Sequence, residues 1–310
     1  MSKEKKPASK HQAKKAVGKK SHYGRDERQP RNLKEALKGK LSKKEMEKLI
    51  ASFDSVGNIA VIQVPKGLEK KAKVIGEALL SMNRHFETVC MISGEHKGKY
   101  RVQPVKVVAG KKSKVAAYKE SGCRFEVHLG RVFFSPRLST ERQRIAGLIK
   151  ENEEIGAFFA GVGPFPIVFA RLSGMKKAYA IELNPEAHRE MLHNILLNKC
   201  QGKIEPIFGD VKKIVPERLA GKCDRVVMPL PKGGENFLQE ALMALKPEGG
   251  IVHFYRFVER DRGAEQAIAE IEGAAQELGF ETKVLRAEKV RSFSPKIQQM
   301  VIDFWAKKKP

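Results

Sequence analysis

The 310-residue sequence lacks the features that mark membrane, secreted and zinc-binding proteins. No stretch reaches the roughly 18 apolar residues of a membrane-spanning helix, and the lysine-rich start has no apolar core of the kind found in signal peptides. Cys90, Cys123, Cys200 and Cys223 stand far apart without a C-x-x-C pair, and the eight histidines form no metal-spaced cluster. We therefore expect a cytoplasmic protein without disulfides, a metal or a membrane partner.

Negative charge is also scarce. The chain has 60 Lys and Arg residues against 36 Asp and Glu, which gives a formal net charge of +24. This excess is far beyond what solubility requires and indicates a polyanionic partner such as a nucleic acid. The first 50 residues contribute +11 of it, from 17 basic and 6 acidic side chains.

The basic N-terminal region divides into two segments. Residues 1–31 hold almost no apolar side chains, so we predict a basic disordered tail that tethers RNA. A solvated extension without a specific role is the alternative interpretation. In residues 32–52, Leu and Ile recur at helical spacing behind Ser42 as a cap, which predicts a short helical segment.

Residues 53–138 predict a smaller β-rich α+β domain, to which we assign RNA binding. The run "KAKVIGEALLSM" has the spacing of an amphipathic helix, whereas the apolar, β-branched runs of this region are typical of strands. The predicted strands are "NIAVIQV", "FETVCMI", "YRVQPVKVVAG", "KVAAYKESG" and "CRFEVHLGRVFFS".

Residues 139–310 predict a second domain in which strands and helices alternate. The strands "GAFFAG", "AYAIEL", "IEPIF", "DRVVMPL" and "GIVHFY" precede helices that start near Pro164, Pro185, Val211, Gly234 and Glu265, and two further strands follow. Such alternation is typical of an α/β fold with a doubly wound, mostly parallel, Rossmann-like sheet.

Three features at the predicted strand ends suggest a nucleoside site. Gly161 and Gly163 lie in the turn after the first strand, where small residues let a ligand approach the backbone near a helix N-terminus. Glu182 closes the second strand, where a carboxylate can bind both ribose hydroxyls, and Asp210 closes the third, where it can accept from an adenine amino group. Together they predict a site for S-adenosylmethionine (AdoMet).

Each feature also has a purely structural interpretation. The glycines can serve a tight turn, Glu182 can simply precede a helix that starts at Asn184 and Pro185, and Asp210 can be a helix cap. An NAD site is a further alternative, although a dinucleotide fingerprint would have a third glycine where this chain has Pro166.

Nine motifs run in order along roughly residues 53–306: "GNIAVIQVP", "YRVQPVKVVAG", "FFSPRLSTER", "FFAGVGPF", "AIELNP", "GDV", "VVMPLPK", "GGIVHFY" and "RSFSP". This order resembles the archaeal and eukaryotic tRNA guanine-37 N1-methyltransferases and their wybutosine-pathway relatives. The pairing of "FSPRLSTER" with "FAGVGPF" is specific to that group. The resemblance implies a class I AdoMet-dependent methyltransferase domain behind an RNA-binding domain.

The resemblance also implies two catalytic residues. Glu141, in "STER", would take the proton from guanine N1, and Arg101, in "YR", would stabilise charge on the base. The pair is chemically sensible, because N1 must lose its proton as the methyl arrives while negative charge builds toward O6. From the residues alone, Thr140 and Gln143 fit a capping box, so a helix-dipole role for Glu141 remains the alternative.

The remaining predicted site residues bind the cofactor or RNA. Four arginines near the "STER" motif have phosphates and a cofactor carboxylate as plausible partners: Arg131, Arg137, Arg142 and Arg144. The predicted cofactor-binding residues are Phe159, Ala160, Gly161, Gly163, Glu182, Leu183, Asp210, Val211 and Pro229.

Three positions depart from the family pattern. Ala157 stands where relatives often have an acidic residue, Pro229 where many have Asn, and His128 where an acid is common before "FFSPR". Pro229 offers a carbonyl but neither an amide proton nor a side-chain donor. The first two changes keep the AdoMet fold credible and leave the target atom open.

We therefore expect a monomeric tRNA methyltransferase that modifies N1 of guanine 37, next to the anticodon. One alternative keeps the fold, namely an aminocarboxypropyl transferase that acts on a wyosine precursor in tRNA. The other is a non-catalytic RNA-binding assembly factor with a degenerate AdoMet pocket.

Overall fold

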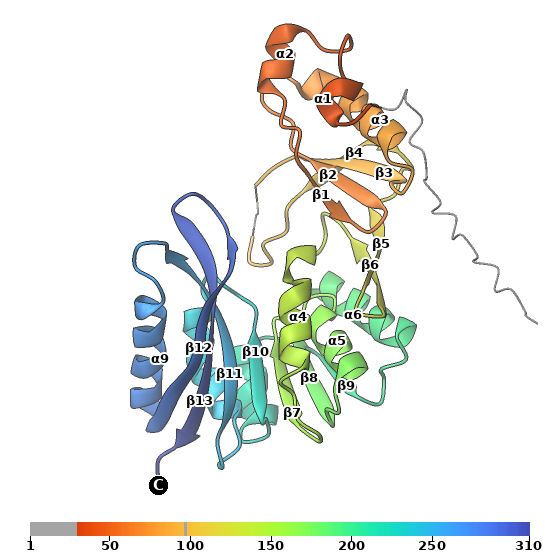
Figure 1. Cartoon of the computed structure of the whole chain (residues 1–310). Coiled ribbons are helices and arrows are strands. Elements are labelled where there is room, and N and C mark those ends of the chain that lie inside the picture. The colour runs from red at the N-terminus through yellow and green to blue at the C-terminus, as the bar shows by residue number, and fades with distance from the viewer. Residues whose placement is uncertain (1–29, 96–97) are drawn as a thin grey trace, which may run out of the picture.

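The structure is a computed structural model that describes residues 30–95 and 98–310 (Figure 1). The predicted tail therefore lies outside the described residues, apart from its last two positions. Figure 1 shows a smaller N-terminal part, with α1 to α3 and β1 to β4, above a larger part built on a wide sheet. Within the described ranges no helix is long and apolar enough to cross a membrane.

The N-terminal part is a four-stranded sheet with helices against it. The strand order is β1-β2-β3-β4, in which only β2 and β3 run parallel. Ser42 forms the expected cap, because its hydroxyl accepts from the Glu45 amide while the Glu45 side chain accepts from the Ser42 amide. The elements are α1 (Leu33–Ala36), α2 (Lys43–Lys48), β1 (Phe53–Val56), β2 (Ile59–Ile62), a 3-10 turn (Glu69–Lys71), α3 (Ala72–Met82), β3 (Thr88–Ile92) and β4 (Val105–Gly110).

Two predicted strands are shorter than expected. "CRFEVHLGRVFFS" forms a strand only over Cys123–His128, so the prediction is wrong for residues 129–135. "YRVQPVKVVAG" forms a strand only over β4, so the prediction is wrong for residues 100–104. Arg101 has φ 52°, a left-handed conformation that no strand accommodates. The segment before β4 is therefore a turn, and Arg101 is presented from that turn.

A hairpin of β5 (Val115–Glu120) and β6 (Cys123–His128) connects the two parts. It pairs with neither sheet and packs on helices of the larger part. Helix α6 (Pro185–Leu197) carries Asn194 and is capped at its C-terminus by Asn198. Asn194 accepts from the Glu126 amide of β6 at 2.8 Å, and Asn198 accepts from the Arg124 amide at 2.9 Å. The hairpin is therefore anchored to the larger part. The domain boundary between residues 138 and 139 remains a prediction.

The larger part is the expected doubly wound, mostly parallel sheet, with strand order β12-β13-β11-β10-β7-β8-β9. Strands β9, β8, β7, β10 and β11 are parallel, while β13 runs antiparallel to both β11 and β12. The strands are β7 (Glu154–Phe158), β8 (Lys177–Glu182), β9 (Ile204–Phe208), β10 (Arg225–Met228), β11 (Gly250–Glu259), β12 (Phe280–Ser292) and β13 (Ile297–Lys308).

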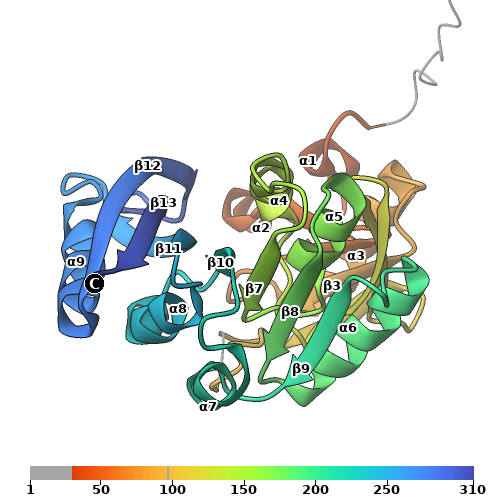
Figure 2. The same ribbon diagram turned by 90° about the horizontal axis from the view of Figure 1, so that it is seen from below.

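Helices cover both faces of this sheet (Figure 2). Alternate residues of β7 point to opposite faces, so that Ile155 packs with α5 and α6 while Phe158 packs with α8. The helical elements are a 3-10 turn (Pro136–Leu138), α4 (Ser139–Ala146), α5 (Pro164–Leu172), α6 (Pro185–Leu197), α7 (Val211–Ile214), a π turn (Val215–Leu219), a 3-10 turn (Gly234–Phe237), α8 (Leu238–Ala244) and α9 (Glu265–Leu278).

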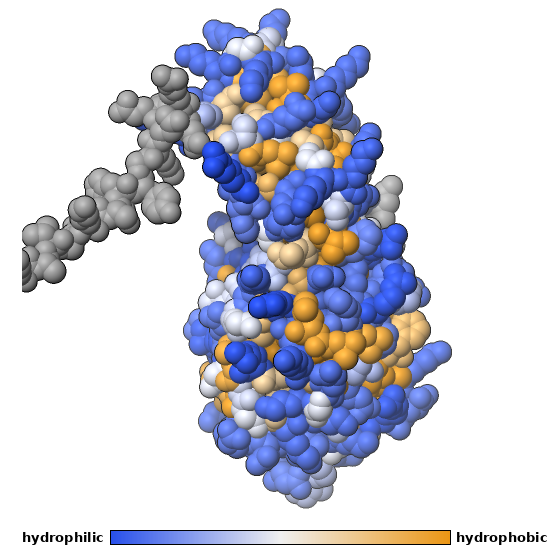
Figure 3. Space-filling view, turned by 90° about the vertical axis from the view of Figure 1, so that its right-hand side faces the viewer, coloured by the Kyte–Doolittle hydropathy of each residue, from blue (hydrophilic) through white to orange (hydrophobic). Residues whose placement is uncertain are grey.

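The strand order reverses between β7 and β10, which creates a switch point at the carboxyl edge of the sheet. Open α/β sheets bind ligands in the crevice outside such a point. The turn after β7 and the ends of β8, β9 and β10 all meet at this edge. Figure 3 shows hydrophilic residues over most of one side of the molecule, with hydrophobic residues gathered in bands on both parts.

Candidate active site

The turn between β7 and α5 is strained. Phe159, Gly161 and Gly163 all have left-handed backbones, with φ values of 55°, 58° and 87°. A Cβ at Gly163 would lie 3.0 Å from Met191 Cγ, so the position requires glycine. The non-glycine Phe159 pays about 1–2 kcal/mol for this conformation, and such strain clusters at functional sites.

Glu182, at the end of β8, holds this turn in place. Its carboxylate accepts from the Gly161 amide and from the Asn184 amide, both at 2.7 Å. Burial raises the pKa of Glu182, and these backbone hydrogen bonds oppose that rise. Asn184 also caps α6 as predicted, since its side chain accepts from the Glu186 amide at 3.1 Å. Glu182 therefore does more than precede a helix.

Asp210, at the end of β9, caps helix α7, as its purely structural interpretation predicted. Its Oδ1 accepts from the Lys212 amide at 3.0 Å and starts the short helix α7. A carboxylate has about four acceptor positions, so a cap of this kind leaves capacity for a ligand. Phe208, two residues earlier, is 55% exposed. The other predicted cofactor residues lie beside these: Ala160 and Val211 are buried, and Leu183 is half-buried.

Pro229 begins the loop that follows β10. The loop is held by the Phe257 amide, which donates to the Pro231 carbonyl at 2.9 Å. Arg101, from the N-terminal part, reaches across and donates to the Lys232 carbonyl. Burial lowers the pKa of Arg101, and the Glu235 carboxylate opposes that change. The structure thus brings the predicted cation to the loop that carries Pro229.

Glu141 lies in the first turn of α4 and is 8% exposed. Arg144 donates to both of its oxygens at 2.9 Å, and the Tyr255 hydroxyl donates at 2.7 Å. Burial, followed by the Glu141 charge, raises the pKa of Tyr255 well above its usual value, so Tyr255 stays protonated and donates. These three bonds use three of about four acceptor positions on the carboxylate.

The predicted capping box at this helix is wrong. The cap position of α4 is Leu138, which makes no side-chain capping bond, and Thr140 already lies inside the helix. Gln143 donates instead to the Ser121 hydroxyl, at 2.9 Å. The 3-10 turn at Pro136–Leu138 runs directly into α4, so the helix starts earlier than the capping pattern suggested.

A chain of buried charged groups continues from Glu141 into the sheet. Arg144 also donates to Asp303 on β13 at 2.5 Å, and Asp303 lies 2.6 Å from His253 Nδ1 on β11. Arg225 Nη1 lies 2.8 Å from His253 Nε2. Since arginine only donates, Nε2 is the acceptor and Nδ1 carries the proton that Asp303 accepts. His253 is therefore neutral, in agreement with a pKa lowered by burial.

Asp303 remains ionised within this chain. Burial alone would raise its pKa, but the hydrogen bond from His253 and the hydrogen bonds and charge of Arg144 outweigh burial and lower the pKa of Asp303 below its usual value. Beyond Arg225 the chain ends at Glu153, which accepts from its guanidinium at 2.8 and 3.0 Å.

Two of the four predicted RNA-binding arginines are engaged inside the protein. Arg142 is 1% exposed and forms a two-pronged ion pair with Glu120 at 2.6 and 2.7 Å, so its assignment to RNA is wrong. Arg144 is committed to Glu141 and Asp303 as described, so the same correction applies to it. Arg131 and Arg137 remain exposed, although each also meets a carboxylate, Glu186 and Asp54 respectively.

Sequence reasoning missed Tyr255, His253 and Asp303. The signal that could have found them is a polar side chain inside an apolar strand, as in "GIVHFY" and "MVIDFW". Buried polar groups need partners, so such interruptions point to a network. In the described ranges no group of three or more His, Cys, Asp or Glu residues could hold a metal ion.

A doubly wound sheet with a glycine turn and two carboxylates at the carboxyl edge of its switch point is typical of nucleoside-binding α/β proteins, the class I AdoMet-dependent methyltransferases among them. The chain belongs to the TRM5/TYW2 methyltransferase family, because residues 116–285 match the family described as "TRM5/TYW2 methyltransferase domain". Residues 33–113 match a second family, described as "TYW2 N-terminal domain".

Two named relatives represent two activities within this family. The tRNA (guanine(37)-N(1))-methyltransferase Trm5b of Pyrococcus abyssi is 34% identical, over 83% of this chain and 75% of its own length. The tRNA(Phe) (4-demethylwyosine(37)-C(7)) aminocarboxypropyltransferase of Methanocaldococcus jannaschii is 30% identical, over 81% of this chain and 96% of its own.

Two solved structures share the fold. The complex of aTrm5 with tRNALeu has a TM-score of 0.79 and 32% identity, covering 94% of this chain and 82% of that one. Methanocaldococcus jannaschii Trm5 in complex with adenosine has a TM-score of 0.73 and 32% identity, covering 87% and 80%.

Proposed function

We propose that this protein transfers the methyl group of AdoMet to N1 of guanine 37 in tRNA. Two observations carry the proposal: Glu141 is a buried carboxylate, and Arg101 reaches from the other part of the chain to the loop that follows β10. Tyr255, which donates to Glu141, lies on β11 two residues before Phe257, and Phe257 holds the loop that Arg101 contacts. A relative named for this activity is similar over most of the chain.

The carboxyl edge of the sheet is the proposed AdoMet site. Glu182 would accept from the ribose hydroxyls, and Asp210 from the adenine amino group. The strained turn with Phe159, Gly161 and Gly163 brings the backbone close to the ligand. Ala160, Leu183, Val211 and the Pro229 carbonyl complete the proposed set.

The proposed chemistry assigns one role to each catalytic side chain. AdoMet supplies an electrophilic methyl group on a sulfonium. Glu141 takes the N1 proton at its remaining acceptor position, because three of about four positions are already used. Arg101 offers positive charge where negative charge would build toward O6. Arg144 and Tyr255 orient the Glu141 carboxylate.

Mass analysis of nucleosides tests this proposal directly. Unmodified tRNA is incubated with the protein and AdoMet, then digested, and we expect N1-methylguanosine as the product. A tRNA with adenosine at position 37 is the matched control and should gain no N1-methylguanosine. Methylation at another nucleotide, or none at all, would contradict the proposed target.

Aminocarboxypropyl transfer is the second candidate function. It is favoured by the match of residues 33–113 to the TYW2 N-terminal domain and by the relative named for that activity. Two of the three departures from the family pattern lie at the proposed cofactor site, Ala157 on strand β7 and Pro229 directly after β10. The same mass analysis, repeated with tRNA that carries a wyosine precursor, would then find an added aminocarboxypropyl group.

Several expectations stay predictions beside these. Arg131 and Arg137 remain as proposed RNA-binding residues, and the domain boundaries at residues 32, 53 and 139 are unchanged. A non-catalytic assembly factor would bind tRNA without modifying it under any of these conditions. A monomer in the cytoplasm is expected, and size-exclusion chromatography with light scattering checks the oligomeric state.

A further inference from the structure

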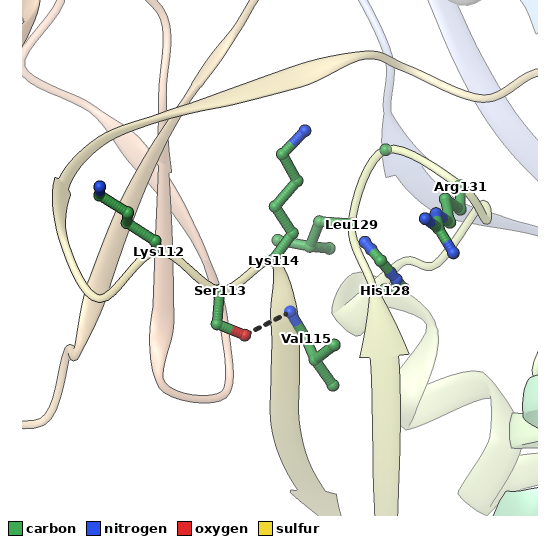
Figure 4. A pocket seen from close by; sticks show the side chains of 8 residues that line it. Lys112, Ser113, Lys114, Val115, His128, Leu129 and Arg131 are labelled. Atoms are coloured by element: carbon green, nitrogen blue, oxygen red, sulfur yellow. Dashed lines mark hydrogen bonds between the residues drawn. The ribbon is translucent and has the colours of Figure 1, made fainter.

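A cavity of about 500 Å³ lies where the β4–β5 loop meets the end of β6 (Figure 4). Its lining comes from two short segments, residues 112–115 and 128–131, and includes no acidic residue. Figure 4 shows Lys112 and Lys114 on the side of the β4–β5 loop, with His128 and Arg131 on the side of β6 and the turn that follows it. This cavity is apart from the proposed AdoMet site and has no role in the chemistry described above.

The charges around the cavity suit an anion. Lys112, Lys114 and Arg131 supply three cationic side chains. Burial, and then the charges of Arg131 and Lys114, lower the pKa of His128, so near neutral pH it offers a neutral ring for hydrogen bonding. Ser113 Oγ accepts from the Val115 amide at 3.2 Å, which leaves its hydroxyl proton to donate.

An adjacent groove along β6 differs from the cavity in the charge of its lining. It shares His128 and Val115 with the cavity but is also lined by Glu126 and Glu190, together with Arg189. Its charges are therefore mixed. Two carboxylates contact lining residues of the cavity without lining it themselves. Glu190 accepts from the His128 amide at 3.0 Å, and Glu186 forms an ion pair with Arg131 at 3.2 Å.

The cavity is also fixed relative to the proposed AdoMet site. Asn184 donates to the Arg131 carbonyl at 3.0 Å, and its own amide donates to Glu182 at 2.7 Å. Asn194 donates to the carbonyls of Glu126 and Val162, both at 3.1 Å, and so ties the hairpin to the glycine turn. An anion held in the cavity would therefore sit at a set distance from the methyl donor.

We propose that this cavity binds a backbone phosphodiester of the RNA substrate and so positions the strand on which the target base lies. The proposal rests on the proposed function, because it requires a nucleic-acid substrate. Phosphate contacts set register without reading sequence, and the cavity offers cations and hydrogen-bond donors but no base-shaped slot.

The test removes the cavity charge and measures the salt dependence of tRNA binding. The Lys112→Gln/Lys114→Gln double variant and Arg131→Gln should each raise the dissociation constant of unmodified tRNA several-fold. The slope of log affinity against log salt should flatten by about 0.7–0.9 for each phosphate that is no longer neutralised. AdoMet affinity by calorimetry and the melting temperature should stay at wild-type values.

The matched control is Lys307→Gln/Lys308→Gln, which also removes two exposed lysines. These residues end β13, whose antiparallel pairing puts them at the opposite edge of the sheet from the carboxyl edge. The control should keep the wild-type salt slope. An equally flattened slope in the control would mean that only total charge matters and would overturn the proposal.

Two other results would also overturn it. One is an unchanged tRNA affinity and slope in the cavity variants. The other combines two measurements. Millimolar inorganic phosphate, at constant ionic strength, would raise the melting temperature of the wild type but not of the double variant, and both proteins would bind tRNA equally. The cavity would then bind free phosphate and not the RNA backbone. Methyl transfer to tRNA by the wild type, measured in parallel, judges the proposed function separately.

Discussion

Glu141 is bonded on both oxygens yet retains room for one more proton donor, and this is the arrangement expected of a general base held in position. Its proposed role can be separated from a structural one. The alternative was a helix-dipole role for Glu141 next to a capping box. The structure has no capping box at this helix, although Glu141 does lie in the first turn of α4.

The first prediction concerns Glu141→Gln. The amide keeps the shape but cannot accept the N1 proton, so single-turnover methyl transfer should slow roughly 100- to 10,000-fold. Rapid quench with saturating enzyme measures the rate, and calorimetry should find AdoMet affinity unchanged. A near-normal rate, with only the lower melting temperature that a disturbed Arg144 ion pair would cause, would make Glu141 a structural residue.

The second prediction concerns Asp303→Asn. Asp303 shares the Arg144 guanidinium with Glu141. Without that second carboxylate, Arg144 would lose one of the two contacts that fix its position beside Glu141. Methyl transfer should therefore slow, as measured by single-turnover rapid quench, while AdoMet affinity stays at the wild-type value.

Glu153→Gln is the matched control for Asp303→Asn. It removes a carboxylate from the far end of the same buried chain, where Glu153 accepts from Arg225. Both variants should lower the melting temperature, because each leaves a buried arginine short of a partner. Only Asp303→Asn should slow methyl transfer, and an equal loss of rate in both variants would show that the effect is general destabilisation.

The third prediction concerns Glu182 and pH. Burial raises the pKa of Glu182, so on acidification its carboxyl becomes protonated at a higher pH than an ordinary glutamate. The ionised form is the better acceptor for ribose hydroxyls. AdoMet affinity should therefore weaken as the pH falls toward this raised pKa, before ordinary carboxylates titrate.

Calorimetry over a pH series measures this effect. Glu182→Gln should bind AdoMet more weakly at neutral pH, by about 1–3 kcal/mol, and should lose the pH dependence. An unchanged pH dependence in Glu182→Gln would assign the titration to another group and remove Glu182 from the proposed site.

At the scale of elements, the turn between β7 and α5 concentrates the strain of the site. The fourth prediction is that Gly163→Ala lowers the free energy of unfolding by about 1–3 kcal/mol, because the new methyl group combines a left-handed backbone with a 3.0 Å approach to Met191. AdoMet binding should weaken with it, since the turn lines the proposed site. Thermal melts and calorimetry measure the two effects.

Gly202→Ala is the control at this scale. Gly202 is exposed, and a Cβ there would meet nothing within 4 Å. The substitution should leave stability and AdoMet affinity near wild type. If both variants behaved alike, the turn would be more tolerant than its backbone angles suggest.

The sequence was most informative where local pattern determines local structure. "IEPIF" is strand β9 at both ends, and α5 and α6 begin at the predicted Pro164 and Pro185, because proline is favoured in the first helical turn. The meeting of Gly161, Glu182 and Asp210 at one edge was also predictable, since carboxyl ends of parallel strands share an edge.

Partners distant in sequence could not be predicted in the same way. Arg142 finds Glu120 only because the β5–β6 hairpin packs beside α4, and Arg144 finds Asp303 across 159 positions of the chain. The sequence alone does not distinguish an exposed arginine that binds RNA from a buried arginine that completes an ion pair. The left-handed turn at Arg101 was likewise hidden by the strand-like run around it.

At the scale of the whole molecule, the first 50 residues contribute +11 of the net charge of +24. The fifth prediction concerns residues 1–29, which lie outside the described residues. If they tether RNA, their deletion should weaken tRNA binding and flatten its salt dependence by about 0.7–0.9 for each phosphate that they neutralise. Filter binding at several salt concentrations measures this, with AdoMet affinity as the property that should not change. An unaltered slope would leave the tail as a solvated extension.

Arg101 donates to the Lys232 carbonyl from a turn of the N-terminal part, whereas Glu141 belongs to the sheet-bearing part. On the proposed roles, neither part alone holds a complete set of reacting groups. A fragment restricted to the sheet-bearing part, even one that keeps the β5–β6 hairpin packed on it, would lack Arg101 and should bind AdoMet without transferring its methyl group. Exchanging one part for that of a distant relative would separate the two proposed catalytic side chains in the same way.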